Sequence, residues 1–139
     1  MSSSLHKIMR SSNPSKMLTN SLQIAIHELE NVTSITRNLI LESHNSQGDE
    51  ALKDCEILFD ESRSLLGKSL SLIMVDHGKS EVDLISKDIK AREKMKENMS
   101  NARDNMKSCQ NGLRGIYYSY LDEVKMKIQV FRMYVDDCL

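Results

Sequence analysis

Two stretches with similar helical patterns, each carrying one cysteine, decide the fold: Ala51-Leu52-Lys53-Asp54-Cys55-Glu56-Ile57-Leu58-Phe59-Asp60-Glu61 and Met99-Ser100-Asn101-Ala102-Arg103-Asp104-Asn105-Met106-Lys107-Ser108-Cys109-Gln110-Asn111-Gly112-Leu113. Each cysteine lies on the apolar stripe of its own helix, so both are expected to face the same core. The spacing alone leaves two alternatives open. The pair acts as two reduced, buried hydrophobes, or it forms one helix-to-helix disulfide, which only an oxidising compartment would keep.

Length and composition predict one soluble, helical domain. The chain has 139 residues with 1 Pro, 9 Met, no Trp and 4% aromatic residues, which favours long helices over strands. A formal net charge of -1 gives no electrostatic footprint for a nucleic acid. No run of about 18 apolar residues occurs, so we expect no membrane span.

The apolar pattern predicts four helices after a mobile N-terminal arm at residues 1–13. The first helix begins at Pro14, and breaks are expected at 44–49, at 76–80 and around Gly112 and Gly115. The other helices are expected at about 49–74, at about 81–111 and from there to about Asp137. Their stripes are Leu18, Leu22, Ala25, Leu29, Val32, Thr36 and Leu39; Leu52, Cys55, Phe59, Ser62, Leu66, Ser69 and Ile73; Met95, Met99, Ala102, Met106, Cys109 and Leu113; and Tyr117, Leu121, Val124, Ile128, Phe131, Val135 and Cys138.

These four stripes predict an all-α, up-down-up-down four-helix bundle over residues 14–139. The same stripes would serve a coiled-coil dimer. The short breaks favour folding back within one chain, so we expect a monomer when the protein is free. Gly67 interrupts the second helix, and we expect it either to weaken the helix or to allow a close helix approach.

The sequence offers little catalytic chemistry. The four histidines are not spaced as metal ligands, and no phosphate-binding loop, nucleophile elbow or metalloprotease motif occurs. We therefore predict no enzyme, no catalytic residue, no cofactor and no metal. The charged stretch from Lys87 to Lys96 is interpreted as a solvated helix face rather than as a nucleic-acid patch.

The two cysteine stretches resemble motifs of the plant invertase and pectin methylesterase inhibitor family, whose domain also forms the pro-region of plant pectinesterases. Ala51 to Cys55, with Leu58 to Glu61 and the leucines that follow, is similar to the family's A-L-x-D-C helix. The second stretch keeps Ser100, Ala102, Asn105, Cys109 and Gly112 of the family's other motif. The closing residues 134–139 are similar to the family's final helix, and the resemblance covers about residues 14–139.

The resemblance implies a four-helix bundle with a disulfide between Cys55 and Cys109, and a protein that inhibits by docking over the substrate cleft of its target. The expected target is a plant pectinesterase, with an acid invertase as the alternative. The bundle lacks the N-terminal helical hairpin, with its two further cysteines, that is typical of the family, and Cys138 has no partner in the family pattern. The resemblance also implies an extracellular, cell-wall location.

Further residues carry weaker predictions. Asp60, Arg63, Arg103 and Asp104 are candidate contacts of the inhibitory face, although plain solvated side chains would have the same pattern. Asn31 and Asn98 each begin an N-glycosylation triplet. The first ten residues lack the apolar segment of a secretory signal, which favours an alternative of another class: an intracellular helical interaction module with reduced thiols.

Overall fold

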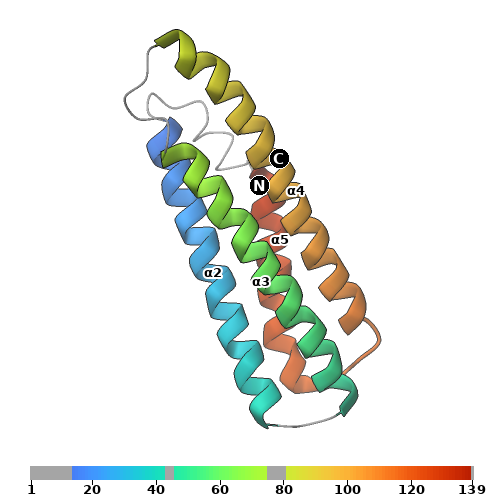
Figure 1. Ribbon diagram of the computed structural model, residues 1–139. Helices are drawn as coiled ribbons and strands as arrows, with labels where there is room; N and C mark the ends of the chain where they lie inside the picture. Colours follow the sequence, from blue (N-terminus) through green and yellow to red (C-terminus); the bar gives the residue numbers. More distant parts are fainter. Residues whose placement is uncertain (1–13, 43–45, 75–80, 139) are drawn as a thin grey trace.

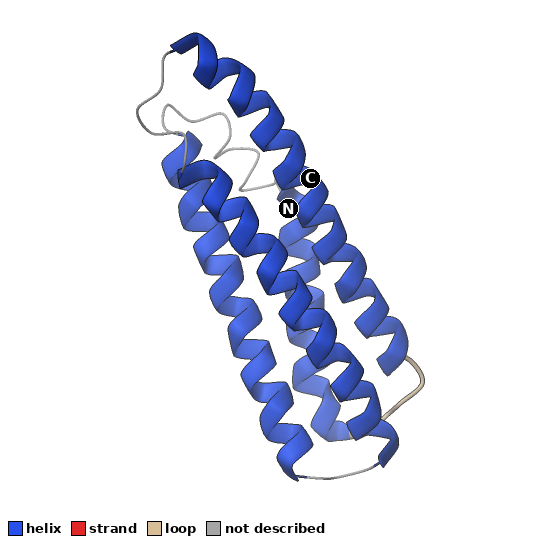
Figure 2. Ribbon diagram, in the orientation of Figure 1, coloured by secondary structure: helices blue, strands red, loops and turns tan. Residues whose placement is uncertain are grey.

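The computed structural model describes residues 14–42, 46–74 and 81–138. These ranges hold four α-helices, α2 (Pro14–Glu42), α3 (Ser46–Met74), α4 (Glu81–Leu113) and α5 (Asp122–Cys138), with a short 3-10 helix, η1 (Ser119–Leu121), before the last. No strand occurs within them (Figure 2). The predicted mobile arm at 1–13 lies outside the described residues.

The helices alternate in direction along the bundle, as predicted (Figure 1). Each packs against its neighbours in the chain, and α5 closes the ring against α2. The contact between α3 and α4 is the most extensive of the four, and that between α2 and α5 is the least extensive. The N-terminal part of α4 extends beyond the ends of the other helices. The bundle is therefore tightest between the two cysteine-bearing helices.

With the exception of Tyr117, the predicted stripe residues whose side chains the structure describes gather in one core. The largest fully buried side chains come from all four helices and from η1. They are Leu22, Leu29 and Val32; Leu52, Phe59 and Leu66; Met106 and Leu113; and Leu121, Val124 and Ile128. Each stripe residue recurs every three or four positions, which keeps one face of each helix toward the centre. The side chains of Leu18, Ile73 and Cys138 lie outside the described residues.

A disulfide joins α3 to α4. The Sγ atoms of Cys55 and Cys109 are 2.06 Å apart, the two Cα atoms are 4.9 Å apart, and each residue is only 1% exposed. This pairing decides between the two alternatives that the spacing left open. The implied Cys55–Cys109 bond is present, and it lies inside the core rather than on the surface.

Two side-chain hydrogen bonds, one buried and one partly buried, continue the α3–α4 contact above the disulfide. Asn105 donates from Nδ2 to the Ser62 hydroxyl, and Asn98 donates from Nδ2 to the Ser69 hydroxyl, each over 3.2 Å. The Ser69 hydroxyl in turn donates to the backbone oxygen of Leu65. Both serines are fully buried at the stripe positions where they were predicted. Because a one-residue slip would leave these groups unpaired, they fix the register of the two helices.

The structure corrects two predicted boundaries. Tyr117 was assigned to the stripe of the last helix, but it is 87% exposed, and that helix begins only at Asp122. Gly115, at φ 84°, turns the chain after α4, and Ile116 is the residue that is buried instead. At the other turn, Ser46 and Gly48 belong to α3, where a loop was expected.

The glycine at position 67 does not allow a close helix approach. A Cβ atom built there would meet no atom within 4 Å. Gly48 behaves differently, because its Cβ would lie 2.0 Å from the hydroxyl oxygen of Tyr120. The close approach therefore occurs at Gly48, where the start of α3 packs against the segment that precedes α5.

Candidate interaction surfaces

Asp60 and Arg63 lie on α3, on the side that faces α2. Arg37 of α2 donates from Nη2 to both carboxylate oxygens of Asp60, at 3.2 and 3.3 Å, and its Nε lies 3.5 Å from Glu56. Arg63 lies 3.8 Å from Glu30 of α2. All these side chains are about one-third to one-half exposed. The two residues thus belong to a solvated ion-pair network over the α2–α3 seam.

Arg103 and Asp104 lie on α4, away from that network. Arg103 is 3.6 Å from Asp136 of α5 and 4.0 Å from Asp104, and it donates to the Ser100 hydroxyl over 3.2 Å. Asp104 is 67% exposed. Since α4 and α5 form the part of the ring opposite α2 and α3, the structure does not bring the four predicted contact residues onto one surface.

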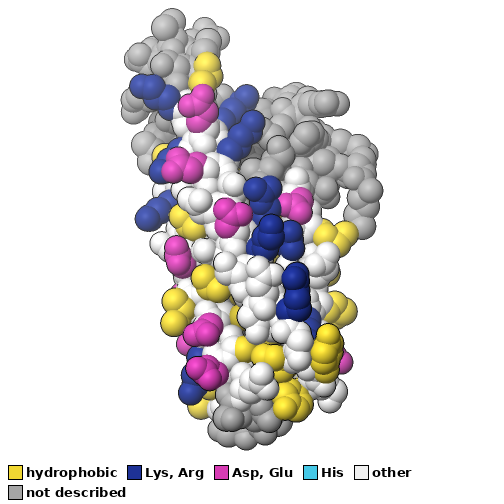
Figure 3. All heavy atoms as spheres, turned by 90° about the vertical axis from the view of Figure 1, so that its right-hand side faces the viewer, with side chains coloured by type: hydrophobic (Ala, Val, Ile, Leu, Met, Phe, Trp, Pro, Cys, Tyr) yellow, Lys and Arg dark blue, Asp and Glu magenta, His cyan; other side chains and the backbone are white. Residues whose placement is uncertain are grey.

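The α4–α5 seam is polar along much of its length. Gln110 of α4 bonds to Gln129 of α5 over 2.9 Å and accepts a 2.7 Å bond from Arg132. Lys and Arg side chains form a column along the face that α4 presents (Figure 3). The sequence did not predict these hydrogen bonds between α4 and α5, because the pattern of one helix does not show which partner a half-buried glutamine contacts.

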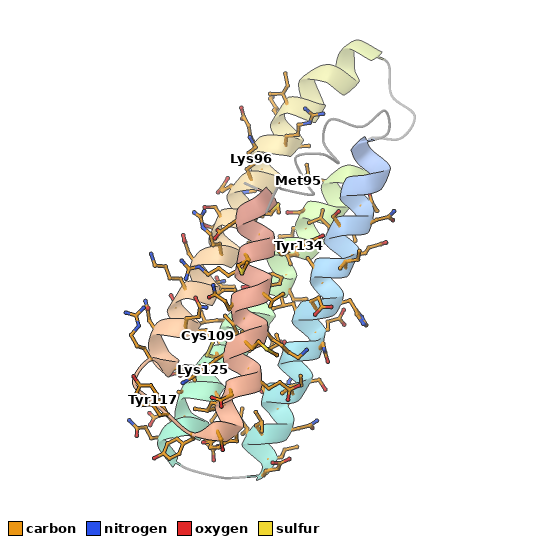
Figure 4. The ribbon with its side chains drawn as sticks, turned by 180° about the vertical axis from the view of Figure 1, so that it is seen from behind. Met95, Lys96, Cys109, Tyr117, Lys125 and Tyr134 are labelled. Carbon is orange, nitrogen blue, oxygen red and sulfur yellow. A yellow bond between two sulfur atoms is a disulfide. The ribbon has the colours of Figure 1, made fainter. Side chains whose placement is uncertain are left out.

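The connection between α4 and α5 places an aromatic side chain at one end of the bundle. Tyr117 projects there, and the Lys125 ammonium lies 5.3 Å from the centre of its ring (Figure 4). The same ammonium donates to the backbone oxygen of Ile116, which holds the connection against α5. An exposed tyrosine of this kind is a common anchor in protein interfaces.

In the same connection between α4 and α5, Tyr120 packs against Gly48 at the start of α3. Its ring stacks on Tyr118 with centroids 5.9 Å apart. Burial, together with the charges of Asp49 and Tyr118, raises the pKa of Tyr120 above its usual value. Tyr120 therefore serves packing at this end, and it is held in its neutral form.

An apolar groove lies between α2 and α5, whose contact is the least extensive of the four around the ring. Ile24, Met126 and Val130 remain 55%, 60% and 59% exposed along it. Tyr134, which points from α5 toward α2 in Figure 4, donates to the backbone oxygen of Ser21. The groove has a volume of about 160 Å³ and is lined by Ile24, Ala25, Glu28, Met126, Lys127, Val130, Phe131 and Tyr134. In the sequence, Met126 and Val130 are visible only as apolar residues outside the predicted stripe of the last helix, and this pattern does not show that they lie beside Ile24 of α2.

The two glycosylation triplets have different environments. Asn31 is exposed on α2. Asn98 is only 2% exposed, and its Nδ2 is bonded to Ser69 inside the α3–α4 contact. The folded structure thus argues against the predicted glycan at Asn98, because the atom that would carry it is enclosed by protein.

Within the described residues, no group of three or more His, Cys, Asp or Glu side chains is arranged to hold a metal ion. No helix in the described part of the chain is long and apolar enough to cross a membrane. The class that the described residues define is an all-α four-helix bundle held by a buried disulfide.

Comparison with protein families places the chain within that class. The family model described as plant invertase/pectin methylesterase inhibitor matches residues 2–139, so the chain belongs to this family. Members of the family are inhibitors and are typically extracellular. Comparison with curated proteins and with solved structures finds no significant match.

Proposed function

We propose that this protein inhibits a plant pectin methylesterase by forming a stoichiometric complex over the enzyme's substrate cleft, and that it acts outside the cell. The observation that carries the proposal is the family match over residues 2–139. The protein itself contributes no catalytic group to this mechanism. It excludes the substrate by occupying the space where the substrate would bind.

The bundle suits such a role physically. A stable protein–protein interface takes about 800 Å² from each partner, which is about a tenth of the 8416 Å² that this chain exposes. A disulfide and two side-chain hydrogen bonds hold α3 against α4, so little freedom at that contact remains to be lost on binding. One side of the bundle is therefore large enough and rigid enough for docking.

Two separate charged surfaces are candidates for the docking face. One contains Asp60 and Arg63 over the α2–α3 seam, and the other contains Arg103 and Asp104 beside α5. Because they lie on opposite parts of the ring, a single docking event covers at most one of them.

Paired charge reversals separate these two surfaces. The variants are Asp60→Lys with Arg63→Glu, and Arg103→Glu with Asp104→Lys, each being the matched control for the other. We expect one double variant to weaken inhibition at least tenfold while the other retains it. Equal losses from both, with both variants folded, would contradict docking through one face.

The main experiment is a titration of the oxidised, monomeric protein against a plant pectin methylesterase, with an acid invertase in parallel. We expect pectin methylesterase activity to fall linearly and to reach its minimum near an equimolar ratio. Absence of any complex at micromolar concentration, with a folded sample, would contradict the proposal.

Of the two alternatives, the first has specific support and the second does not. The family description names invertase as well as pectin methylesterase, so selective loss of invertase activity in the parallel assay would assign that target. An intracellular interaction module with reduced thiols is less consistent with the paired Cys55 and Cys109. Mass analysis of the native protein under non-reducing conditions distinguishes this second alternative, because it requires both thiols to be free.

A further inference from the structure

We propose that Asn31 is the N-glycosylated residue of this protein, that Asn98 is unmodified in the folded molecule, and that the glycan on Asn31 covers the apolar α2–α5 groove. The inference rests on the proposed extracellular function, because N-linked glycans are added on the secretory route. It begins from the different surroundings of the two triplets.

The acceptor hydroxyl of the first triplet shows when modification must occur. In the folded protein, Thr33 is 7% exposed and donates a 2.7 Å hydrogen bond to the backbone oxygen of Leu29. A transferase cannot engage that hydroxyl in the helix. Both triplets must therefore be modified, or escape modification, before the bundle folds.

Folding then selects between the two sites. A glycan on Nδ2 of Asn98 would have to replace the bond to Ser69 and pass through the contact between α3 and α4. That contact cannot close around a sugar, so chains modified at Asn98 do not reach the folded state. A glycan on Asn31 projects into solvent and leaves the core unchanged.

The position of Asn31 directs its glycan to the groove. Asn31 follows Ile24 by seven residues, which places the two on the same face of α2 at about 10 Å along the axis. Side chains on an α-helix tilt toward its N-terminus, so the Asn31 amide leans toward Glu28 and Ile24, both of which line the groove. The first sugars of the glycan therefore start at the end of the groove nearest to Asn31 and extend along the groove.

Covering the groove has a physical benefit. Ile24, Met126 and Val130 form a continuous exposed apolar strip, a feature that promotes self-association in a free monomer. A covalently attached, hydrated glycan shields the strip without requiring a partner protein. It also excludes this side of the bundle from the inhibitory contact.

The site assignment is tested on the full chain secreted from plant cells behind a cleavable leader, with glycopeptide mass analysis of the folded, monomeric fraction. Asn31→Gln removes the first triplet at an exposed position. Ser100→Ala removes the second triplet and leaves the buried Asn98 in place. We expect one glycan, lost in Asn31→Gln and retained in Ser100→Ala. A glycan on Asn98 in the folded fraction, or an unmodified Asn31, would overturn the assignment.

Covering of the groove is tested by peroxide oxidation of the same protein before and after enzymatic removal of the glycan. Met126 lines the groove, whereas Met133, 45% exposed on the same helix, is not a lining residue and is the internal control. We expect the glycan to slow oxidation of Met126 severalfold and to change Met133 much less. An equal Met126 rate in both forms would overturn the covering role. Neither result depends on inhibition, so failure here is distinguishable from failure of the proposed function.

Discussion

Reduction of the Cys55–Cys109 bond should lower the free energy of unfolding by about 4 kcal/mol. The two cysteines are separated by 54 positions, and the chain-entropy model assigns about 14 cal/mol/K to closing such a loop, which gives the stated value at 25 °C. With about 2.1 cal/mol/K per residue over 139 residues, the melting temperature should fall by roughly 14 °C. The reduced form keeps the same buried atoms, so the comparison isolates the cross-link.

The assay is urea unfolding of the oxidised and the reduced protein, followed by circular dichroism, in a Cys138→Ser background that removes the third thiol. Burial of the bond at 1% exposure adds a kinetic expectation: reductant should act much more slowly on the native protein than on the unfolded chain. A stability difference below about 1 kcal/mol, or equal reduction rates in the two states, would refute the reasoning.

Four other substitutions test further parts of the bundle. Asn98→Ala should lower the free energy of unfolding in urea by about 1–3 kcal/mol, because it removes a buried hydrogen bond between α3 and α4. A change near zero would contradict the role of Asn98 in fixing the register of the two helices. Gly67→Ala should stabilise by about 0.5–1 kcal/mol, whereas Gly48→Ala should destabilise, because only the second Cβ meets Tyr120; the opposite order of melting temperatures would contradict this. Burial and the charge of Asp49 raise the pKa of Tyr120 above 10.0. As the pH rises, the hydroxyl therefore ionises in the unfolded chain before it ionises in the folded protein. The stability that this group contributes is present below pH 10 and is lost as the pH rises further. In unfolding curves from pH 8 to 11, Tyr120→Phe should lose less stability than the wild type.

Much of the fold follows from the periodic spacing of apolar residues, which is visible in the sequence itself. The stripes that contain Cys55 and Cys109, including the buried serines at positions 62 and 69, were predicted from three- and four-residue steps alone. The stripe of the last helix extended one step too far, to Tyr117. Gly115 provides a left-handed turn there, and periodicity does not indicate where such a turn separates a helix from the segment before it.

The surfaces were less predictable, because they depend on which helices become neighbours. Asp60 and Arg103 looked equivalent as exposed charges, but the ring order places them on opposite seams with different partners. The buried state of Asn98 was likewise not predicted, since both triplets lie in helices and the triplet pattern does not show which asparagine packs against a neighbouring helix. The α2–α5 groove arises from the weakest helix contact in the ring, which no single helix pattern encodes.

The central claim is that the bundle occupies the place of the substrate, and it is tested most directly by measuring inhibition of pectin methylesterase at increasing pectin concentrations. The account predicts competition: the apparent inhibition constant rises linearly with pectin concentration, while the maximal velocity is unchanged. An inhibition constant independent of pectin, or no inhibition at an equimolar ratio, would contradict it.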